Sequence, residues 1–534
     1  MPLSEPERPV LPLWAAVVAS AAGGLLLDVA FPSVGWWPIA FVAVALAIVS
    51  LIGRMAGGAL LTGFVFGVAF YLMNVDFTAR WVGPLPWVAL SVFESLFVAV
   101  GALLIALAYR WVPRVLPARW ARLTVLPAIV AGLWTAREEV TGGFPYGGFP
   151  WGRVGTSQVG GPLIETASWL GTAGLSFLVV VLSAAAIEIV RTTPWRSRTT
   201  AVREGAIPIG AVVVVLVAAA VIPAWQTTPA GDIRVVSVQG DGPAGYFDVR
   251  ERGDILMSQF DATEPLFGEE DVDAVVWPEG SVDLDPRDSA VAASALNRVS
   301  RAFDAPLVAN MVRLEGDEYF NTSFVWVAGE GITQTYDKRN PVPFGEYVPD
   351  RAFYRAIAPD LIDMIGRDYT PGVNPPVFDL DGFRAGLAIC FDVIYDALVW
   401  EGATGGAGVY FFQTNNADFR GTDENLQQLA VARLRAIETG RSVVNISTVG
   451  TSQVIAPDGT TVDALPADEP GAMLTDVELR TGLTPAVVAG AWIKAVLAWG
   501  SVAALAVVAG LVATRRRADA KAPAPEGTGV SEPK

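Results

Sequence analysis

The sequence contains no histidine and only one cysteine, Cys390. Without histidine, the Ser-His-Asp and Cys-His forms of nucleophilic catalysis are excluded, as is every metal site that needs an imidazole ligand. A single cysteine excludes disulfides within the chain and metal clusters held by several thiolates. A nucleophile in this chain therefore needs a base other than histidine.

Lysine is also scarce. Of 37 basic residues only four are lysines, namely Lys338, Lys494, Lys521 and Lys534. Lys338 is the only lysine between residues 225 and 485, where it stands among 17 arginines. Lysine can shift its pKa and present a compact ammonium, which arginine cannot do. Either Lys338 has a task that arginine cannot perform or it is retained by chance, and its position must decide.

Hydrophobic residues make up 52% of the 534 residues, which is too apolar for an ordinary soluble protein of this size. They gather in runs long enough to span a bilayer. We expect eight spans, near residues 12–30, 37–53, 57–75, 86–109, 123–141, 163–190, 206–224 and 486–513. The predicted organisation is a bundle of seven transmembrane helices over 1–224, a globular domain over 225–485, a last transmembrane helix over 486–513 and a disordered tail over 514–534.

Arginines recur after every second expected span. They follow the second, fourth, sixth and eighth spans, at Arg54 and within 110–122, 191–203 and 515–517. Because cytoplasmic loops of membrane proteins are enriched in basic residues, this pattern predicts that both termini lie in the cytoplasm. The domain after the seventh span is then extracytoplasmic.

The domain over 225–485 is acidic, with 41 acidic and 18 basic residues. Nucleic-acid binding is not expected, because neutralising phosphates requires a basic face. Short β-rich runs alternate here with helical stretches, which predicts a layered α/β domain. The expected strands are 233–238, 273–277, 306–310, 323–328, 384–389, 408–413, 443–448 and 452–455, and the expected helices are 248–262, 287–303, 392–401 and 422–440.

Three residues of this domain form a candidate acyl-transfer site. Cys390 follows an expected strand and precedes an expected helix, where backbone N–H groups can bind an oxyanion and the helix N-terminus can lower the thiol pKa. Glu279 ends another strand, and Lys338 lies in a segment rich in proline and aromatics. A carboxylate can act as base for the thiol, and an ammonium can stabilise the tetrahedral intermediate. The alternative for Cys390 is a small buried apolar residue.

These residues lie in segments that resemble the signatures of the nitrilase superfamily. The segments are WPEGS around Glu279, DKRNPVPFGEYVP around Lys338 and Glu346, and GLAICFDVIY around Cys390. The FGEYVP segment and the eight-span frame are similar to the apolipoprotein N-acyltransferase family in particular. Further similar blocks are GGFPWGRVGTSQVGGPL at 147–163, TNNADF at 414–419 and RLRAIETGRSVVNISTVGTSQVIAPDG at 433–459.

The resemblance implies a nitrilase-like αββα sandwich joined to the α-helical transmembrane bundle, in a bacterial cytoplasmic membrane. It implies that Cys390 takes an acyl chain from a phospholipid as a thioester and passes it to the α-amino group of a diacylglyceryl-modified apolipoprotein. Glu279 would be the general base and later the acid, and Lys338 with the Phe391 N–H would hold the oxyanion. Glu346 would orient Lys338, and Asn415 is assigned a supporting role. No cofactor or metal is implied.

The sequence departs from the family pattern at three places. The family commonly has Tyr-Glu after the nucleophile, where this chain has Phe391-Asp392. A Lys-Trp pair is replaced near Tyr246-Phe247, and Asp418 differs in the asparagine block.

Two other readings stay open, a membrane-tethered amidase or hydrolase that passes the acyl group to water, and a scaffold or transporter with an inactive domain. The segment 350–366 is predicted to form a lid or access arm.

Overall fold

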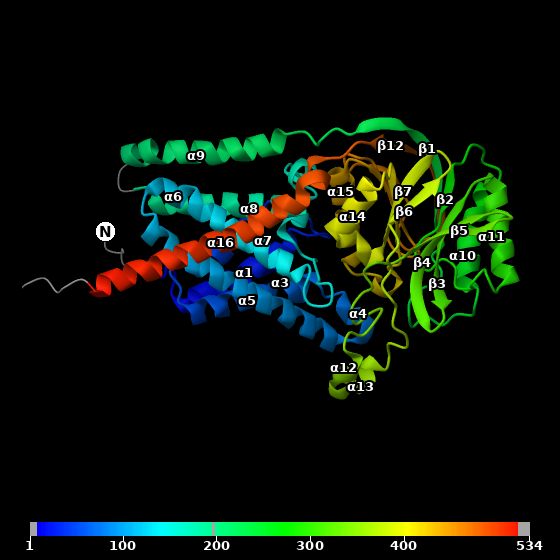
Figure 1. Ribbon diagram of the computed structural model, residues 1–534, viewed down its shortest axis with the longest axis horizontal. Coiled ribbons are helices and arrows are strands. Elements are labelled where there is room, and N and C mark those ends of the chain that lie inside the picture. Colours follow the sequence, from blue (N-terminus) through cyan, green and yellow to red (C-terminus); the bar gives the residue numbers. More distant parts are fainter. Residues whose placement is uncertain (1–7, 195–197, 522–534) are drawn as a thin grey trace, which may run out of the picture.

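The computed structural model describes residues 8–194 and 198–521. The molecule is elongated, with a bundle of helices at one end and an α/β domain at the other (Figure 1). The sequence predicted a disordered tail over 514–534. Residues 514–521 instead continue the last helix, which ends at Lys521, and residues 522–534 lie outside the described residues.

The helices of the bundle follow the apolar runs. Proline stands at or just before the first residue of α1, α2, α5 and α16, where its missing N–H costs no helical hydrogen bond. The helices are α1 (Leu13–Val29), α2 (Ile39–Leu51), α3 (Ala56–Asn74), α5 (Pro84–Val115), α7 (Val125–Thr141), α8 (Ala167–Thr192), α9 (Arg198–Val221) and α16 (Pro485–Lys521), with short α4 (Thr78–Val82) and α6 (Arg119–Leu123).

Within the described residues, α3, α5, α8, α9 and α16 are long and apolar enough to cross a membrane. Helices α1 and α2 are apolar but shorter, with 17 and 13 residues. The chain is therefore a membrane protein with about five to seven apolar candidate spans, fewer than the eight expected. The expected span at 123–141 forms helix α7, but this helix has 17 residues and carries Arg137, Glu138 and Glu139, so it is not among the apolar candidate spans.

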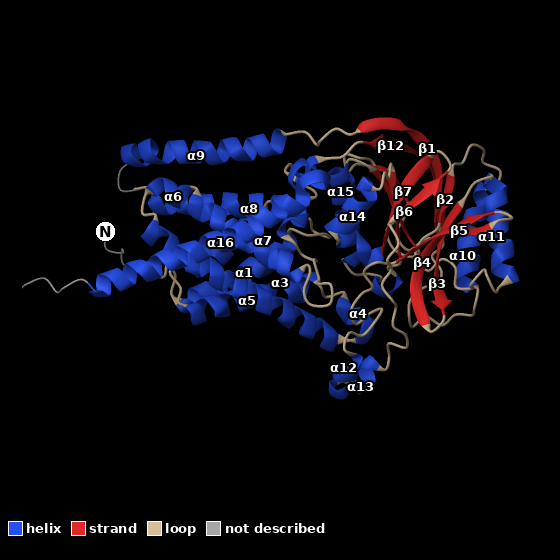
Figure 2. Cartoon of the chain, viewed as in Figure 1, coloured by secondary structure: helices blue, strands red, loops and turns tan. Residues whose placement is uncertain are grey.

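The α/β domain consists of two six-stranded sheets that pack face to face (Figure 2). The first has the order β12-β1-β2-β3-β4-β5 and the second the order β11-β10-β9-β8-β7-β6. The strands are β1 (Thr228–Gln239), β2 (Ala274–Val276), β3 (Leu307–Glu315), β4 (Glu318–Val327), β5 (Gly331–Asp337), β6 (Val377–Leu380), β7 (Phe383–Ile389), β8 (Val409–Thr414), β9 (Ser442–Ser447), β10 (Gln453–Ile455), β11 (Thr461–Ala464) and β12 (Gly471–Thr481).

Helices cover the outer face of each sheet, which completes an αββα sandwich. Helices α10 (Asp254–Thr263) and α11 (Ala290–Phe303) cover the first sheet, and α14 (Asp396–Thr404) and α15 (Glu424–Thr439) cover the second. Alternate residues of a strand face opposite layers. Val235 and Val276 belong to the core shared with the second sheet, whereas Val236 and Val275 belong to the core under α10 and α11. The predicted α/β sandwich is thus present.

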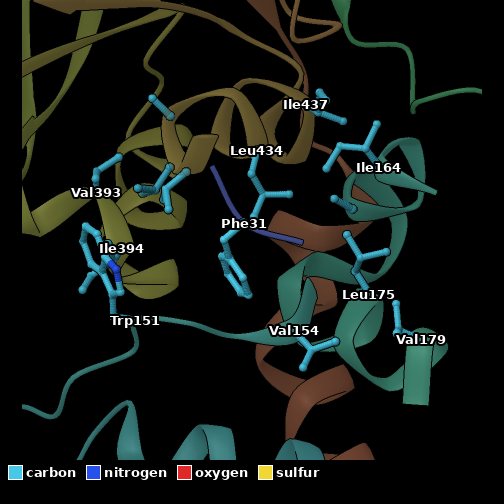
Figure 3. Packing of buried hydrophobic residues seen from close by; sticks show 14 of the residues in the cluster. Phe31, Trp151, Val154, Ile164, Leu175, Val179, Val393, Ile394, Leu434 and Ile437 are labelled. Atoms are coloured by element: carbon cyan, nitrogen blue, oxygen red, sulfur yellow. The ribbon is translucent and has the colours of Figure 1, made fainter. Parts of the chain in front are cut away.

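The bundle and the domain share one hydrophobic core. Residues from the bundle and its loops pack in the same cluster as residues of the turn after β7 and of α15 (Figure 3). The labelled side chains at this junction are Phe31, Trp151, Val154, Ile164, Leu175, Val179, Val393, Ile394, Leu434 and Ile437. Because burial of apolar surface is the main favourable term in association, this continuous core joins the two parts firmly.

Candidate active site

Glu279 belongs to the first sheet and follows its central strand, β2. Gly280 adopts φ +67°, a left-handed conformation that glycine takes without steric cost, and its N–H donates to Asn310 Oδ1 at 2.8 Å. The carboxylate of Glu279 is only 8% exposed and accepts hydrogen bonds from Asn321 Nδ2 at 2.7 Å and from Lys338 Nζ at 3.4 Å. The turn after β2 thus delivers a buried but hydrogen-bonded carboxylate.

Lys338 directly follows β5, and its N–H continues the pairing with β4 by donating to Asn321 O at 2.8 Å. Its ammonium lies 2.8 Å from Glu346 Oε2 and 3.4 Å from Glu279 Oε1. Asn321 Nδ2 also donates to Glu346 Oε1, at 3.1 Å, so the same amide bridges both carboxylates. One buried cation therefore lies between two carboxylates, and the fold brings together Glu279, Lys338 and Glu346, which the family resemblance singled out.

Cys390 comes from the second sheet, at the end of β7. It has φ +49°, a backbone region that costs a residue with a side chain about 1 kcal/mol or more. The following residues form a 3-10 turn, Cys390–Ile394, and helix α14 begins only at Asp396. Gln428 Nε2 donates to Cys390 Sγ at 3.5 Å. The nucleophile candidate thus sits on a strained turn at a strand end, six residues before α14 begins.

The electrostatics of this group follow from burial and from its excess of carboxylates. Burial raises the pKa of Glu279, and the charge of Lys338 opposes this rise. Burial disfavours the charged form of Lys338, but Glu279 and Glu346 raise its pKa well above the usual value. Burial and Glu279 raise the pKa of Cys390 well above that of a free thiol, with Lys338 opposing. The sequence led us to expect a lowered thiol pKa, but burial and the nearby carboxylates raise it. The residues after Cys390 also form a short 3-10 turn rather than the start of an α-helix.

Phe391 and Asp392 flank the position expected to bind an oxyanion. The Phe391 ring stacks on Phe149 of the loop after α7, with centroids 5.9 Å apart. Asp392 is fully buried and accepts hydrogen bonds from Tyr336 OH at 2.8 Å and from Asn340 N and Nδ2 at 2.9 Å each. Asp392 therefore ties the turn of Cys390 to the segment that carries Lys338.

The side chain of Asn415 is hydrogen-bonded to backbone groups of two loops. Its Nδ2 donates to Ala244 O at 3.0 Å, and its Oδ1 accepts from Ala417 N at 3.1 Å. Two residues that depart from the family pattern lie nearby and contact each other: Tyr246 N donates to Asp418 Oδ1 at 2.9 Å. The departures at Tyr246 and Asp418 thus contact each other and fix the loop after β1 to the loop after β8.

A second buried charge cluster, which we call the clamp, consists of Arg153, Asp396, Arg435, Glu438 and Lys494. Arg153 donates to both oxygens of Asp396, at 2.9 and 2.8 Å, and to Ile394 O at 3.1 Å. Arg435 donates to Asp396 Oδ1 at 2.7 Å, to Val393 O at 2.9 Å and to Ile394 O at 2.8 Å. Arg153 and Lys494 come from the bundle, so the clamp holds the far end of the Cys390–Ile394 turn from the membrane side.

Helix α8 contributes to the clamp through a break in its first turn. Gly171 has φ +69°, and the N–H of Thr172 donates to Glu438 Oε1 at 3.3 Å. Arg435 pairs with Glu438 from one turn earlier on α15. Lys494 Nζ lies 3.0 Å from Glu139 Oε2 and 3.8 Å from Asp396 Oδ2. Every charge of the clamp therefore faces an opposite charge.

Sequence reasoning did not identify Asn321, Gln428 or the clamp. Asn321 and Gln428 are ordinary polar residues within a strand and a helix, and nothing local marks them. Arg153 and Arg435 do lie in the blocks 147–163 and 433–459 that resemble the family. Membership of these blocks was the signal available, but it did not show which of their charged residues are buried and paired.

Two family models match the chain. The apolipoprotein N-acyltransferase N-terminal domain matches residues 23–185, and carbon-nitrogen hydrolase matches residues 264–482. The second match contains Glu279, Lys338 and Cys390. The first covers most of the helices before the α/β domain.

Curated relatives and solved structures are also similar. The apolipoprotein N-acyltransferase of Mycolicibacterium smegmatis is 34% identical over 93% of this chain and 86% of its own, and that of Azotobacter vinelandii is 29% identical over 96% and 98%. An amidase from Nesterenkonia sp. matches at 19% identity and a TM-score of 0.36, over 48% of this chain and 93% of its own. Nit3 of Saccharomyces cerevisiae, a member of the nitrilase superfamily, matches at 18% and 0.37, over 51% and 97%. With a relative above 30% identity matched along nearly its whole length, this chain belongs to the apolipoprotein N-acyltransferase family and is an acyltransferase of the nitrilase superfamily.

Proposed function

We propose that Cys390 carries a fatty acyl group as a thioester between a phospholipid donor and the α-amino group of a diacylglyceryl-modified N-terminal cysteine of an apolipoprotein. The observation that supports this most is the ion-paired group of Glu279, Lys338 and Glu346 in electrostatic contact with the Cys390 thiol. In a chain without histidine, these residues supply a base, an oxyanion partner and a nucleophile.

In the first half-reaction Glu279 takes the thiol proton while Cys390 Sγ attacks the ester carbonyl of the phospholipid. The bond to the glycerol oxygen then breaks, and Glu279 returns the proton to that oxygen as the lysophospholipid leaves. The raised pKa of Glu279 suits this exchange, since a base is most effective when its pKa lies near the working pH. The raised pKa of the thiol means that its proton leaves during attack, so the resting site holds no exposed thiolate.

The tetrahedral intermediate carries one negative charge on the former carbonyl oxygen. Lys338 Nζ and the backbone N–H of Phe391 are the proposed donors to this oxyanion. Glu346 fixes the ammonium at 2.8 Å and is itself held by the N–H of Val342 at 2.7 Å. A donor set held this firmly needs little rearrangement when the charge develops, which is the main source of catalysis by such groups.

In the second half-reaction the α-amino nitrogen attacks the thioester carbonyl. Glu279 takes a proton from the amine, the carbon–sulfur bond breaks, and the proton passes to the departing sulfur of Cys390. The products are an amide on the apolipoprotein and the free thiol. The enzyme thus alternates between free and acylated forms, which predicts ping-pong kinetics.

Both substrates are anchored in a membrane, so the site must stand at a membrane surface. We propose eight crossings, with α1, α2 and α7 completing the five longer spans, and the arginine clusters on the cytoplasmic side. The site would then face the outside of a bacterial cytoplasmic membrane. The arm of α12 (Arg351–Ile357) and α13 (Pro359–Ile362) projects from the edge of the molecule and exposes Phe353 and Ile357, which suits contact with lipid (Figure 1).

The test is the mass of the Cys390 peptide after the purified chain is incubated with phospholipid vesicles, beside a Cys390→Ala control. We expect a fatty-acyl adduct on Cys390 that hydroxylamine removes and that a diacylglyceryl-peptide with a free amine discharges as its N-acyl product. No adduct with folded protein would overturn the thioester. An adduct discharged by water as fast as by the peptide would favour a hydrolase instead.

A further inference from the structure

A second polar side chain contacts the proposed nucleophile from the side of α15. Gln428 is 2% exposed, and its Nε2 donates to Cys390 Sγ at 3.5 Å. None of the steps above uses this contact. Buried side-chain amides are normally fully hydrogen-bonded, so the hydrogen-bond partners of Gln428 indicate its role.

The other end of the Gln428 amide is fixed by a polar chain. Gln428 Oε1 accepts from Asn416 Nδ2 at 3.0 Å, and the same Nδ2 donates to Glu424 Oε2 at 2.6 Å. Ser447 Oγ donates to Asn416 Oδ1 at 2.8 Å. With its oxygen occupied, the Gln428 amide presents its N–H to the sulfur. Asn416 therefore sets the orientation of Gln428, although it does not contact the thiol.

The charges around the thiol suggest a role for the Gln428 N–H. Lys338 already faces the carboxylates of Glu279 and Glu346. A thiolate formed beside two carboxylates needs further stabilisation, and a neutral amide supplies it without competing for the proton. A hydrogen bond to an ionised acceptor is roughly twice as strong as one between neutral groups. The bond from Gln428 thus strengthens when charge develops on sulfur, which is the condition for lowering a barrier.

We propose that Gln428 is a catalytic residue that donates a hydrogen bond to the Cys390 thiolate, and that Asn416 is the positioning residue that orients it. This rests on the proposed role of Cys390 as nucleophile. The thiolate arises twice, when sulfur attacks the phospholipid and when it departs from the thioester under attack by the amine. In both steps Gln428 keeps its proton, while Glu279 exchanges protons with the thiol, the lysophospholipid oxygen and the amine.

The neighbouring residue offers a matched control. Gln427 is also buried, at 4% exposed, on the same helix. Its Oε1 accepts from Trp151 Nε1 at 2.6 Å, and its Nε2 donates to Asn74 O at 3.2 Å, so it anchors α15 to the bundle. Gln427→Met and Gln428→Met remove equally buried amides of similar volume one residue apart. Of these two residues, only Gln428 contacts the sulfur.

The experiment measures alkylation of the full-length purified chain by iodoacetamide as a function of pH. Because the chain has one cysteine, the signal reports Cys390 alone. We expect Gln428→Met to raise the midpoint of the pH profile by about one unit, since one hydrogen bond to a charged group has that magnitude. Gln427→Met should leave the midpoint within about 0.3 unit of the parent chain, as expected for a residue that does not contact the sulfur.

A second variant covers failure of the first to fold. Asn416→Ala frees the Gln428 amide and should raise the midpoint by roughly half as much, since an unanchored donor keeps part of its bond. An unchanged midpoint in folded Gln428→Met, or an equal rise in Gln427→Met, would overturn the proposal. Alkylation requires neither phospholipid nor acceptor, so its result is independent of whether acyl transfer occurs. With acyl transfer established, Gln428→Met should also slow discharge of the thioester to the amine about tenfold.

Discussion

Two buried charge clusters hold the two ends of the Cys390–Ile394 turn, and they behave differently. At the first end, Glu279 and Glu346 share the single cation Lys338. At the other end, the clamp matches its carboxylates with cations, and Asp396 faces both Arg153 and Arg435. Burial is similar, since all of these side chains except Glu346 and Lys494 are nearly inaccessible. The balance of charge is what differs.

The pKa directions show what this balance does. Burial raises the pKa of Glu279, and one shared lysine does not reverse it. Burial also opposes ionisation of Asp396, but Arg153 and Arg435 hold its pKa well below the usual value. Glu438, the other carboxylate of the clamp, has a raised pKa because of burial, although Arg435 opposes the rise. Two arginines thus hold Asp396 as an ion, whereas one shared lysine leaves Glu279 able to exchange a proton.

The largest effect is expected at the cluster with excess carboxylate. Glu279→Gln keeps the size and the hydrogen bonds but removes the base, and it should slow formation of the Cys390 thioester by about 10² to 10⁴-fold. The rate is measured by mass spectrometry after rapid mixing with phospholipid. Thermal unfolding in detergent should stay close to that of the parent chain. A thioester formed at the parent rate would remove Glu279 from its proposed role.

The clamp should respond in stability rather than in chemistry. Arg153→Met leaves Asp396 with fewer partners in a buried site, and losing one partner of such a pair costs about 3–5 kcal/mol. We expect a marked drop in the unfolding temperature and a slower thioester step, because the carbonyl of Ile394 also loses a donor. Chemical or thermal unfolding of the detergent-solubilised chain measures the first effect.

A double variant separates the pair from the packing around it. Arg153→Met combined with Asp396→Leu removes both charges, and replacement of a buried pair by apolar residues is often nearly neutral. The double variant should therefore recover part of the stability lost in Arg153→Met. If the two single losses add in full, the pair is not coupled and the clamp has no special role.

The two clusters should also separate on acidification. The pKa of Glu279 is raised above its ordinary value near 4.5, so its base form is lost as pH falls through that raised pKa. The pKa of Asp396 is lowered, so its contribution to stability is present above the unfolded value, about 4, and is lost only as pH falls through the lower folded value. Thioester formation should thus fall about tenfold per pH unit while unfolding temperature changes little. If the rate of thioester formation and the unfolding temperature fell over the same pH range, the proposed difference between the two clusters would be contradicted.

A smaller effect is expected between the clusters, at Asp392. Tyr336→Phe removes one hydrogen bond to this carboxylate and leaves those from Asn340. A bond to a charged group contributes about 1.5–3 kcal/mol, and the remaining donors reduce the loss. We expect a severalfold slower thioester step with a modest loss of stability. The same rates for Tyr336→Phe and the parent chain would mean that the donors other than Tyr336 suffice to position Asp392.

Much of this arrangement was predictable from the sequence. All eight expected strands and all four expected helices of the α/β domain are present, and Glu279 and Cys390 do follow strands. The apolar runs of buried parallel strands such as β2 and β8 carry a strong signal. Strands β5, β6, β11 and β12 were not predicted, because edge and outer strands such as β12 alternate polar and apolar residues and resemble loops.

The contacts between distant segments were not predictable. Arg153 and Asp396 are 243 residues apart, and no local pattern links a loop of the bundle with the start of α14. The same holds for Gln428, which reaches a thiol 38 residues earlier in the chain. Such pairs depend on how the bundle docks on the domain, and that follows from the shared core rather than from any motif.

Helix α9 runs along the outside of the bundle next to α8, and only 6% of its apolar 18-residue stretch is buried (Figure 1). A cavity of about 780 Å³ lies between the first half of α9 and α6 and α8, with Arg119, Trp120, Ile207 and Val212 in its walls. In a bilayer, lipid chains are the expected occupants of this space. Solubilisation replaces those chains with detergent tails, so the choice of surfactant and of lipid added back becomes a structural variable when this protein is purified.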